Sequence, residues 1–209
     1  MEKFSRLTAI ACPLDLANID TDQVLPARFL KMTRASGLGR VLFHDLRFDA
    51  QAQERPDFPL NRPPWRDARI LFAGRNFAGG SSREAAVYAL LDYGIRCVIA
   101  PSFGDIFAQN AVMNGLLPGA AAPQDIEAVV RVLKADPARH VTVDLDDQSF
   151  SCADMRYPFV IDAVRRQKLL NGWDDIDLTR QYRARIDAFV QSDVDSRPWA
   201  RPWQKAGRS

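Results

Sequence analysis

The sequence has few of the residues that hold metal ions. Its 209 residues include 3 cysteines and 2 histidines. Cys12, Cys97 and Cys152 are far apart and form no C-x-x-C pair, and His44 and His140 are isolated. A structural zinc site or an iron–sulfur cluster held by one chain requires ligands that are grouped more closely. We therefore expect no metal and no cofactor site in this chain, and we interpret the cysteines as packing residues. If the function involves a metal, another chain must carry it.

Three further features are missing, and each excludes a class of protein. No apolar run approaches the roughly 20 residues of a membrane-spanning helix. The net charge is only +2, whereas nucleic-acid-binding proteins usually show a strong basic patch. The N-terminal residues 1–6 lead directly into folded-looking sequence without the apolar core of a signal peptide. We expect a cytoplasmic protein that binds neither nucleic acid nor membrane.

The composition is that of a globular protein, with 47% hydrophobic and 26% charged residues. Short apolar runs that alternate with amphipathic stretches favour parallel strands joined by helices. Strands are predicted at residues 7–12, 70–73, 96–100 and 116–118, a β-hairpin at 140–152, and helices at 82–93, 105–114, 124–135, 159–170 and 175–191. The predicted fold is α/β: a mixed, partly parallel sheet flanked by helices, with a β-hairpin and C-terminal helices. We expect one domain over residues 1–191, which includes a long loop at 31–66, and a tail at 192–209 that is either poorly ordered or an arm that reaches a partner.

One stretch, residues 69–84, has the features of an anion-binding site. A buried strand leads through a turn rich in glycine into Ser81-Ser82-Arg83-Glu84, which opens a helix. Glycines let the backbone approach a ligand, and the N–H groups and positive dipole end of the helix then face it. The same residues also suit an ordinary N-cap, with Ser81 or Ser82 as the capping residue and Glu84 in the first turn.

Two other segments carry candidate site residues. Residues 18–26 are dense in short polar side chains, which predicts either an Asx-type turn or a rigid loop that places Asp22, and with it Asp20, in a pocket. The long loop at 31–66 is broken by glycines and prolines, and such loops are usually functional or mobile. Its basic residues and a preceding arginine would guide an anionic substrate or simply form a solvated surface. They are Arg28, Lys31, Arg34 and Arg40.

Several separate motifs, in one order, resemble the small subunits of 3-isopropylmalate dehydratase, the swivelling domain of the aconitase superfamily. The resemblance runs from Leu7 to Phe189. The motifs are Asn18-Ile-Asp-Thr-Asp-Gln23, Phe29-Leu-Lys31, Leu42-Phe-His-Asp-Leu-Arg47, Asn76-Phe77 with Gly80-Ser-Ser-Arg-Glu84, Pro101-Ser-Phe103, Asp105-Ile-Phe107, Asn114-Gly-Leu-Leu-Pro118, and Leu169-Leu-Asn-Gly172 with Asp174-Asp175-Ile176.

The resemblance implies a swivelling-type β/β/α domain and an isomerising hydro-lyase built from two chains. The large subunit would carry a [4Fe–4S] cluster, and this chain would supply the proton-handling part of the site for a small 2-hydroxy diacid. By the same resemblance Ser81 is the base and Asp22 an acid that supports the site. The residues implied to bind the substrate are Ser82 and Arg83, joined by Lys31 and Asp20. Removing a proton beside a carboxylate builds up negative charge, which explains a site rich in N–H donors and an arginine.

The sequence departs from the family's turn pattern, Asn-Phe-Gly-Cys-Gly-Ser-Ser-Arg-Glu-His, at three positions. Ala78, Gly79 and Ala85 stand where the pattern has glycine, cysteine and histidine. The leading interpretation is conversion of 2-isopropylmalate to 3-isopropylmalate in leucine biosynthesis. The alternatives are a related small subunit for citramalate, a dimethylmalate or homoaconitate, or a non-catalytic anion-binding relative. Apolar residues in the long loop favour an apolar substituent on the substrate, and we expect the discriminating contacts there: Leu38, Val41, Leu42 and Phe43.

Overall fold

A computed structural model describes residues 1–80 and 83–200. The chain forms two compact units, Met1–Gly172 and Trp173–Ser209. The first unit ends at Gly172, whereas the sequence predicted a domain that continues to residue 191. In the described parts of the chain, no helix combines the length and the apolar composition that crossing a bilayer requires.

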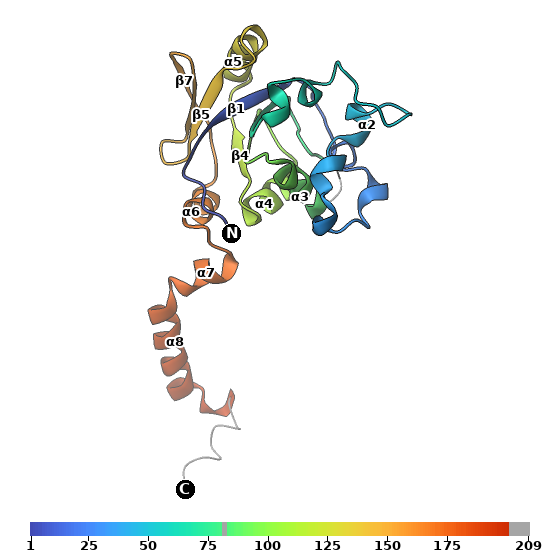
Figure 1. Cartoon of the computed structure of the whole chain (residues 1–209). Coiled ribbons are helices and arrows are strands. Elements are labelled where there is room, and N and C mark those ends of the chain that lie inside the picture. The colour runs from blue at the N-terminus through green and yellow to red at the C-terminus, as the bar shows by residue number, and fades with distance from the viewer. Residues whose placement is uncertain (81–82, 201–209) are drawn as a thin grey trace. The chain divides into compact units, whose positions relative to one another are not determined.

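The first unit is built on a seven-stranded sheet with the order β4-β3-β2-β1-β5-β6-β7. Figure 1 labels β1, β4, β5 and β7 of this sheet. Strands β1 to β4 run parallel, and β5, β6 and β7 continue the sheet antiparallel from β1. The strands are β1 Arg6–Leu14, β2 Ile70–Ala73, β3 Cys97–Ala100, β4 Leu117–Ala120, β5 His140–Asp144, β6 Ser149–Cys152 and β7 Met155–Pro158. The mixed sheet and the hairpin are as predicted, and β7 adds a strand that the sequence analysis did not identify.

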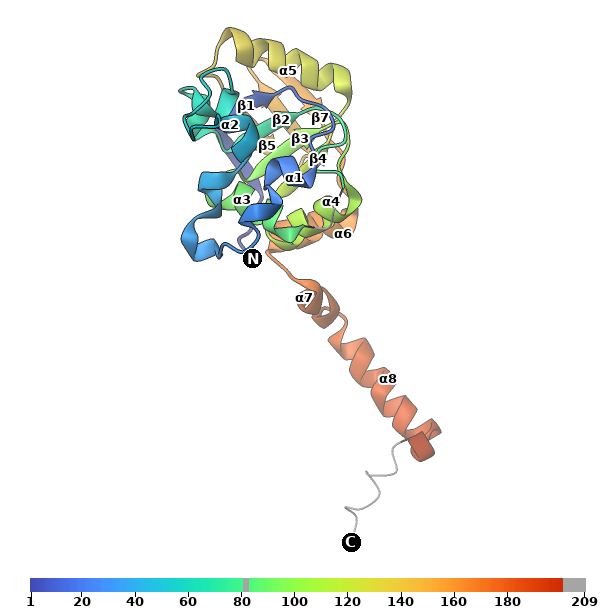
Figure 2. The same ribbon diagram turned by 90° about the vertical axis from the view of Figure 1, so that its right-hand side faces the viewer.

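Helices cover both faces of the parallel part of this sheet, so β2 and β3 are apolar and buried on both sides. Leu71 and Val98 pack in one hydrophobic cluster with residues of α3, and Ile70 and Ile99 pack in a second cluster with residues of α5. The two views place α3 and α5 on opposite sides of the sheet (Figure 1, Figure 2). The α-helices of this unit are α1 Thr21–Val24, α2 His44–Arg47, α3 Glu84–Tyr93, α4 Asp105–Met113, α5 Pro123–Ala135 and α6 Ala163–Asn171.

The long loop is more ordered than its sequence suggested. Besides α2 it contains short 3-10 helices at Arg34–Ser36, Leu38–Val41, Pro59–Asn61 and Trp65–Asp67, and another lies just before it at Ala27–Phe29. The turn at Leu38–Val41 packs closely on the C-terminal end of α3, because an added Cβ on Gly39 would lie 2.5 Å from the backbone N of Tyr93. The loop is therefore anchored on the same helix whose N-terminal end carries Arg83.

The second unit consists of helices. They are α7 Asp175–Arg180, α8 Arg183–Ser196 and a 3-10 turn at Pro198–Ala200. The single helix predicted at 175–191 is therefore divided near Gln181, and its second part extends five residues into the predicted tail. Asp174 caps α7 through the backbone N–H of Asp177. Tyr182 and Phe189 are exposed.

Candidate active site

The turn at residues 76–80 lies between two other loops at the carboxyl ends of the parallel strands, which is where open α/β sheets bind ligands. The N–H of Ala78 donates to the carbonyl of Ile19 at 2.6 Å, and the N–H of Phe77 donates to the carbonyl of Ser102 at 3.0 Å. These bonds hold the turn between the segment that contains Asp20 and Asp22 and the segment that leads into α4. Three motifs that are far apart in the sequence thereby meet at one edge of the sheet.

Every second residue of this turn has its backbone in the left-handed region. Asn76, Ala78 and Gly80 have φ angles of 55°, 53° and 92°. Glycine adopts this region freely, whereas alanine pays about 1–2 kcal/mol. Such strain persists only where the surrounding structure imposes it, and it is concentrated at functional sites.

Asp20 begins helix α1 and thereby places Asp22. Its Oδ1 accepts the N–H of Gln23 at 2.7 Å, and the Gln23 side chain accepts the N–H of Asp20 at 2.9 Å, which is a capping box. Both interpretations of this segment are thus combined: it is a capped local turn, and it presents Asp22 towards the residues that follow the glycine turn. Asp22 itself accepts the N–H of Ala27 at 2.7 Å through Oδ1.

Arg83 binds Asp22 across the edge of the sheet. The Arg83 guanidinium donates to Asp22 Oδ1, and the Arg83 side chain is only 20% exposed. The hydrogen bond from Arg83 and the N–H of Ala27 hold the pKa of Asp22 below its usual value. Because α3 begins directly after Arg83, the guanidinium stands at the positive end of a ten-residue helix. The geometry is suited to binding an anion.

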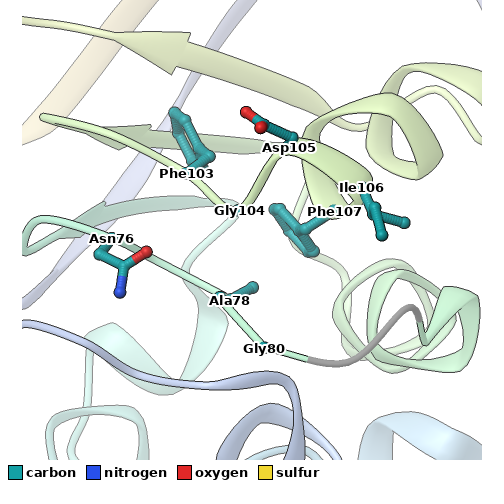
Figure 3. A pocket seen from close by; sticks show the side chains of 9 residues that line it. Asn76, Ala78, Gly80, Phe103, Gly104, Asp105, Ile106 and Phe107 are labelled. Atoms are coloured by element: carbon teal, nitrogen blue, oxygen red, sulfur yellow. The ribbon is translucent and has the colours of Figure 1, made fainter.

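Two cavities adjoin these groups. The first has a volume of about 360 Å³ and lies between the glycine turn and the segment from Phe103 to Phe107 (Figure 3). The second has a volume of about 410 Å³ and is lined by Asp20, Asp22, Gln23, Pro26, Ala27, Arg28, Asp45 and Leu46. Beside Asp22, Arg28 bridges Asp45 and the Nδ1 of His44, the latter at 3.1 Å. This network places both signs of charge around the second cavity.

The other predicted site residues stand as follows. Ser81 and Ser82 lie outside the described residues. Lys31 is exposed and is not among the described residues that line the two cavities. Asp20 and Asp22 both line the second cavity, and Arg83 is brought to Asp22. The catalytic and binding roles of all six residues stay predictions.

Comparison with known proteins identifies the family. Residues 1–123 match the family model of the aconitase C-terminal domain. The 3-isopropylmalate dehydratase small subunit of Dinoroseobacter shibae is 50% identical over 95% of this chain and 100% of its own length. That of Rhodospirillum centenum is 50% identical over 96% of this chain and 99% of its own length. The chain belongs to the 3-isopropylmalate dehydratase small-subunit family.

The chain is also similar in three-dimensional structure to a solved protein of this family. The crystal structure of a 3-isopropylmalate dehydratase from Methanocaldococcus jannaschii covers 90% of this chain with a TM-score of 0.64 and 25% identity. The swivelling-type α/β fold implied by the sequence motifs is therefore confirmed.

The cysteines of this small-subunit family member are buried apart from one another. Cys12 and Cys97 belong to the two different hydrophobic clusters, and Cys152 lies on β6. Burial raises the pKa of all three thiols, which disfavours the thiolate that a metal requires. Across residues 1–80 and 83–200, no group of three or more His, Cys, Asp or Glu side chains is placed to hold a metal ion. An iron–sulfur cluster does not fit the described residues of this chain.

The prediction about substrate contacts is wrong for three of its four residues. Leu38, Leu42 and Phe43 are each at most 2% exposed, whereas Val41 is half-buried and its contact stays a prediction. The ring of Phe43 packs against those of Phe58 and Phe77 at 5.9 and 6.5 Å. The three buried residues attach the long loop to the core, and a substrate does not reach them.

The side chains of the first cavity belong to motifs that carry the family resemblance, but sequence analysis assigned them no role in the site. Phe103 is half-buried and Ile106 is 45% exposed, although both are large and apolar. Phe107 and Ala111 form the inward-facing side of α4. The helical period alone would have placed Ile106 on the outward-facing side, and an apolar residue there was the available signal.

Proposed function

We propose that this chain is the small subunit of a two-chain 3-isopropylmalate dehydratase, a hydro-lyase that interconverts 2- and 3-isopropylmalate in leucine biosynthesis. The proposal rests above all on 50% identity to small subunits of that name over nearly the whole of both chains. The geometry supports it because Arg83 and Asp22, each in a separate motif, meet at the ligand-binding edge of the sheet. The proposed location is the cytoplasm.

In this proposal Ser81 removes the proton next to a substrate carboxylate. A serine hydroxyl is too weak a base in water, but its oxyanion gains stability from backbone N–H groups and a nearby arginine. The proton moves from the substrate carbon to Ser81 Oγ and returns to carbon when water adds in the other orientation. In this proposal the large subunit provides the part of the site that binds the departing hydroxyl group.

Arg83 holds a substrate carboxylate. A guanidinium carries five N–H donors, so the contact of Arg83 Nη1 with Asp22 is compatible with a second, bidentate contact to a carboxylate. Asp22 fixes the orientation of Arg83 before the substrate arrives, which lowers the entropic cost of binding. Ser82, Lys31 and Asp20 are the further substrate-binding candidates.

The partner is a large subunit, and the [4Fe–4S] cluster belongs to it in this proposal. In this proposal each of the two chains supplies part of the active site. The isolated chain is expected to contain less than about one iron atom per ten molecules and to be inactive, which iron analysis and an assay of the purified chain would check.

The deciding experiment is turnover by the complex of this chain with its large subunit. The wild-type complex should interconvert 2- and 3-isopropylmalate. Ser81→Ala should lower kcat by at least about 10³-fold, the scale of removing a nucleophile or base. Ser192→Ala, at an exposed serine of α8, is the matched control and should leave kcat unchanged. A complex with an intact cluster that converts no 2-hydroxy diacid would overturn the proposal.

A further inference from the structure

We propose that the first cavity receives the substituent on the reacting carbon of the substrate, and that Ile106 and Asp105 select a small branched alkyl group over a carboxylate-bearing one. The inference rests on the proposed function and adds residues that determine specificity for it. They belong to the start of α4, outside the long loop in which the sequence predicted the discriminating contacts.

The cavity is placed for this role. Gly79 and Gly80 line it, and Gly80 is followed directly by Ser81. An added Cβ on Gly104 would lie 2.6 Å from the carbonyl oxygen of Ala78, so the two walls approach each other closely at the base of the cavity. Because Ser81 directly follows Gly80 in the chain, the space between the glycine turn and the start of α4 is within reach of a substituent on the carbon whose proton Ser81 is proposed to handle.

The far wall of the cavity is apolar and partly exposed. Phe103, Ile106 and Phe107 all line it, and the rings of Phe103 and Phe107 are stacked with centroids 6.2 Å apart. Figure 3 shows this segment opposite the turn that carries Asn76, Ala78 and Gly80. The stacked pair is held in place by Phe77, whose ring lies 5.5 Å from that of Phe107. A rigid aromatic wall with Ile106 at its mouth removes apolar surface from water when an alkyl group enters.

The charge of the cavity opposes a carboxylate. Among its described lining residues, Asp105 is the one charged side chain, and none is lysine, arginine or histidine. Asp105 stands in the first turn of α4 and is exposed at the cavity. A substituent that ends in a carboxylate would meet a like charge without a cation to balance it, which costs affinity. A neutral alkyl group meets no such penalty.

The test uses the complex of this chain with its large subunit and three substrates that differ at one position. They are malates that carry methyl, isopropyl or carboxymethyl at C3. Ile106→Ala should lower kcat/KM for the isopropyl substrate by about 10-fold and for the methyl substrate by less than about 2-fold, because a methylene in a pocket is worth about 10-fold or more. Met113→Ala is the matched control, since Met113 is on the same helix and is also 45% exposed.

Asp105 is tested with the charged substrate. Asp105→Lys should raise kcat/KM for the carboxymethyl substrate relative to the isopropyl substrate by at least about 10-fold, because it replaces repulsion with attraction. Asp105→Asn should give a smaller change in the same direction. Asp125→Asn, at the first turn of α5, is the control and should leave the ratio unchanged.

The outcomes separate this inference from the proposed function. If the wild-type complex converts 3-isopropylmalate but neither Ile106→Ala nor Asp105→Lys changes the ratio between substrates, the inference is overturned and the proposed function stands. If the wild-type complex converts none of the three substrates, both are overturned. Thermal unfolding of each variant confirms that a changed ratio is not due to partial unfolding.

Discussion

Arg83 donates to the carboxylate of Asp22, a residue 61 positions earlier in the chain. Asp22 lies on α1 and Arg83 directly precedes α3, so the contact joins the two polar motifs that follow β1 and β2. The same Oδ1 of Asp22 also accepts the N–H of Ala27, which further fixes the side chain. The arginine is thus oriented by a carboxylate whose own position is set by a capped helix.

Arg83→Lys should lower kcat/KM of the complex by about 10²–10³-fold, the range found when one preorganised donor is removed from a charged transition state. Lysine keeps the charge but loses the planar fork that suits bidentate carboxylate binding. Steady-state kinetics with 3-isopropylmalate would measure the loss. Asp22→Asn keeps the shape and removes the charge, and it should raise KM more than it lowers kcat. Unchanged kinetics in both variants would contradict the roles assigned to this pair.

The regular elements at the edge of the sheet could be predicted from the sequence because their patterns are local. The apolar run at Ile70–Ala73 predicted the strand β2, and the glycine at position 94 predicted the end of the helix α3. The structure contains both elements. Gly94 indeed caps α3 with φ of 115°. The strand β7 was missed because its burial alternates weakly, with no residue in it fully buried.

The long loop could not be predicted, since its structure depends on tertiary contacts. Leu42 and Phe43 are buried because the loop packs against α3 and Phe77, and these long-range contacts cannot be read from the loop's own sequence. In the candidate site, the motif residues Asp22 and Arg83 were identified, but their mutual contact was not. Ile106 was given no role because a single apolar residue on the outward-facing side of a helix is a weak signal, and the cavity that it lines is formed by segments far apart in the sequence.

Asp45 should show a pH-dependent contribution to stability. The Arg28 guanidinium lowers the pKa of Asp45 from 3.8 to about 2. A carboxyl group whose pKa is lower in the folded state stabilises the fold above its unfolded pKa, and this contribution disappears as the pH falls through the folded value. The difference in Tm between wild type and Asp45→Asn should therefore be constant above about pH 5 and shrink between about pH 4 and pH 2.

Thermal unfolding at a series of pH values would measure this difference. Asp57→Asn, at another exposed aspartate of the long loop, is the control. A difference that persists unchanged down to pH 2 would exclude the Arg28 contact as its source.

Asn61 should be essential for the stability of the long loop. It is 7% exposed, its Oδ1 accepts from Arg47 Nε at 3.1 Å, and its Nδ2 donates to the carbonyls of Arg47 and Arg55 at 2.7 and 2.9 Å. Asn61→Ala leaves several buried polar groups without a partner and should lower the free energy of unfolding by about 2–4 kcal/mol. Urea unfolding of the isolated chain would measure it, and Gln51→Ala, at an exposed residue, should change it by less than about 0.5 kcal/mol.

Gly39→Ala should detach the loop from α3. The new Cβ would lie 2.6 and 2.7 Å from the carbonyl carbon and oxygen of Asp92. Helix backbone cannot yield, so the loop must move, at a cost of about 2–3 kcal/mol. Trypsin should then cleave at Arg34 and Arg40 faster than in the wild type. Gly37→Ala is the comparison, because its φ of 80° is strained but its nearest neighbour is the flexible side chain of Arg40 at 3.5 Å; it should cost only about 1 kcal/mol.

Gly79 should tolerate a larger residue only when Asn76 gives way. An added Cβ on Gly79 would lie 2.9 Å from Oδ1 and 3.2 Å from Nδ2 of Asn76. The Asn76 carboxamide is held there by Asn18, whose Oδ1 accepts from Nδ2 at 3.3 Å. Gly79→Ala should therefore lower the free energy of unfolding by about 1–3 kcal/mol, the usual cost of overpacking.

The same substitution in an Asn76→Gly background should cost less than about 0.5 kcal/mol, which makes the two changes strongly non-additive. Glycine suits position 76 because its φ of 55° lies in the left-handed region. Urea unfolding of the four chains would give the coupling free energy. Equal costs in both backgrounds would mean that Asn76 does not fill the space beside Gly79. The family pattern has a cysteine at position 79, and this chain has glycine. A coupling of the expected sign would show that the glycine leaves the space that the Asn76 side chain occupies beside the turn.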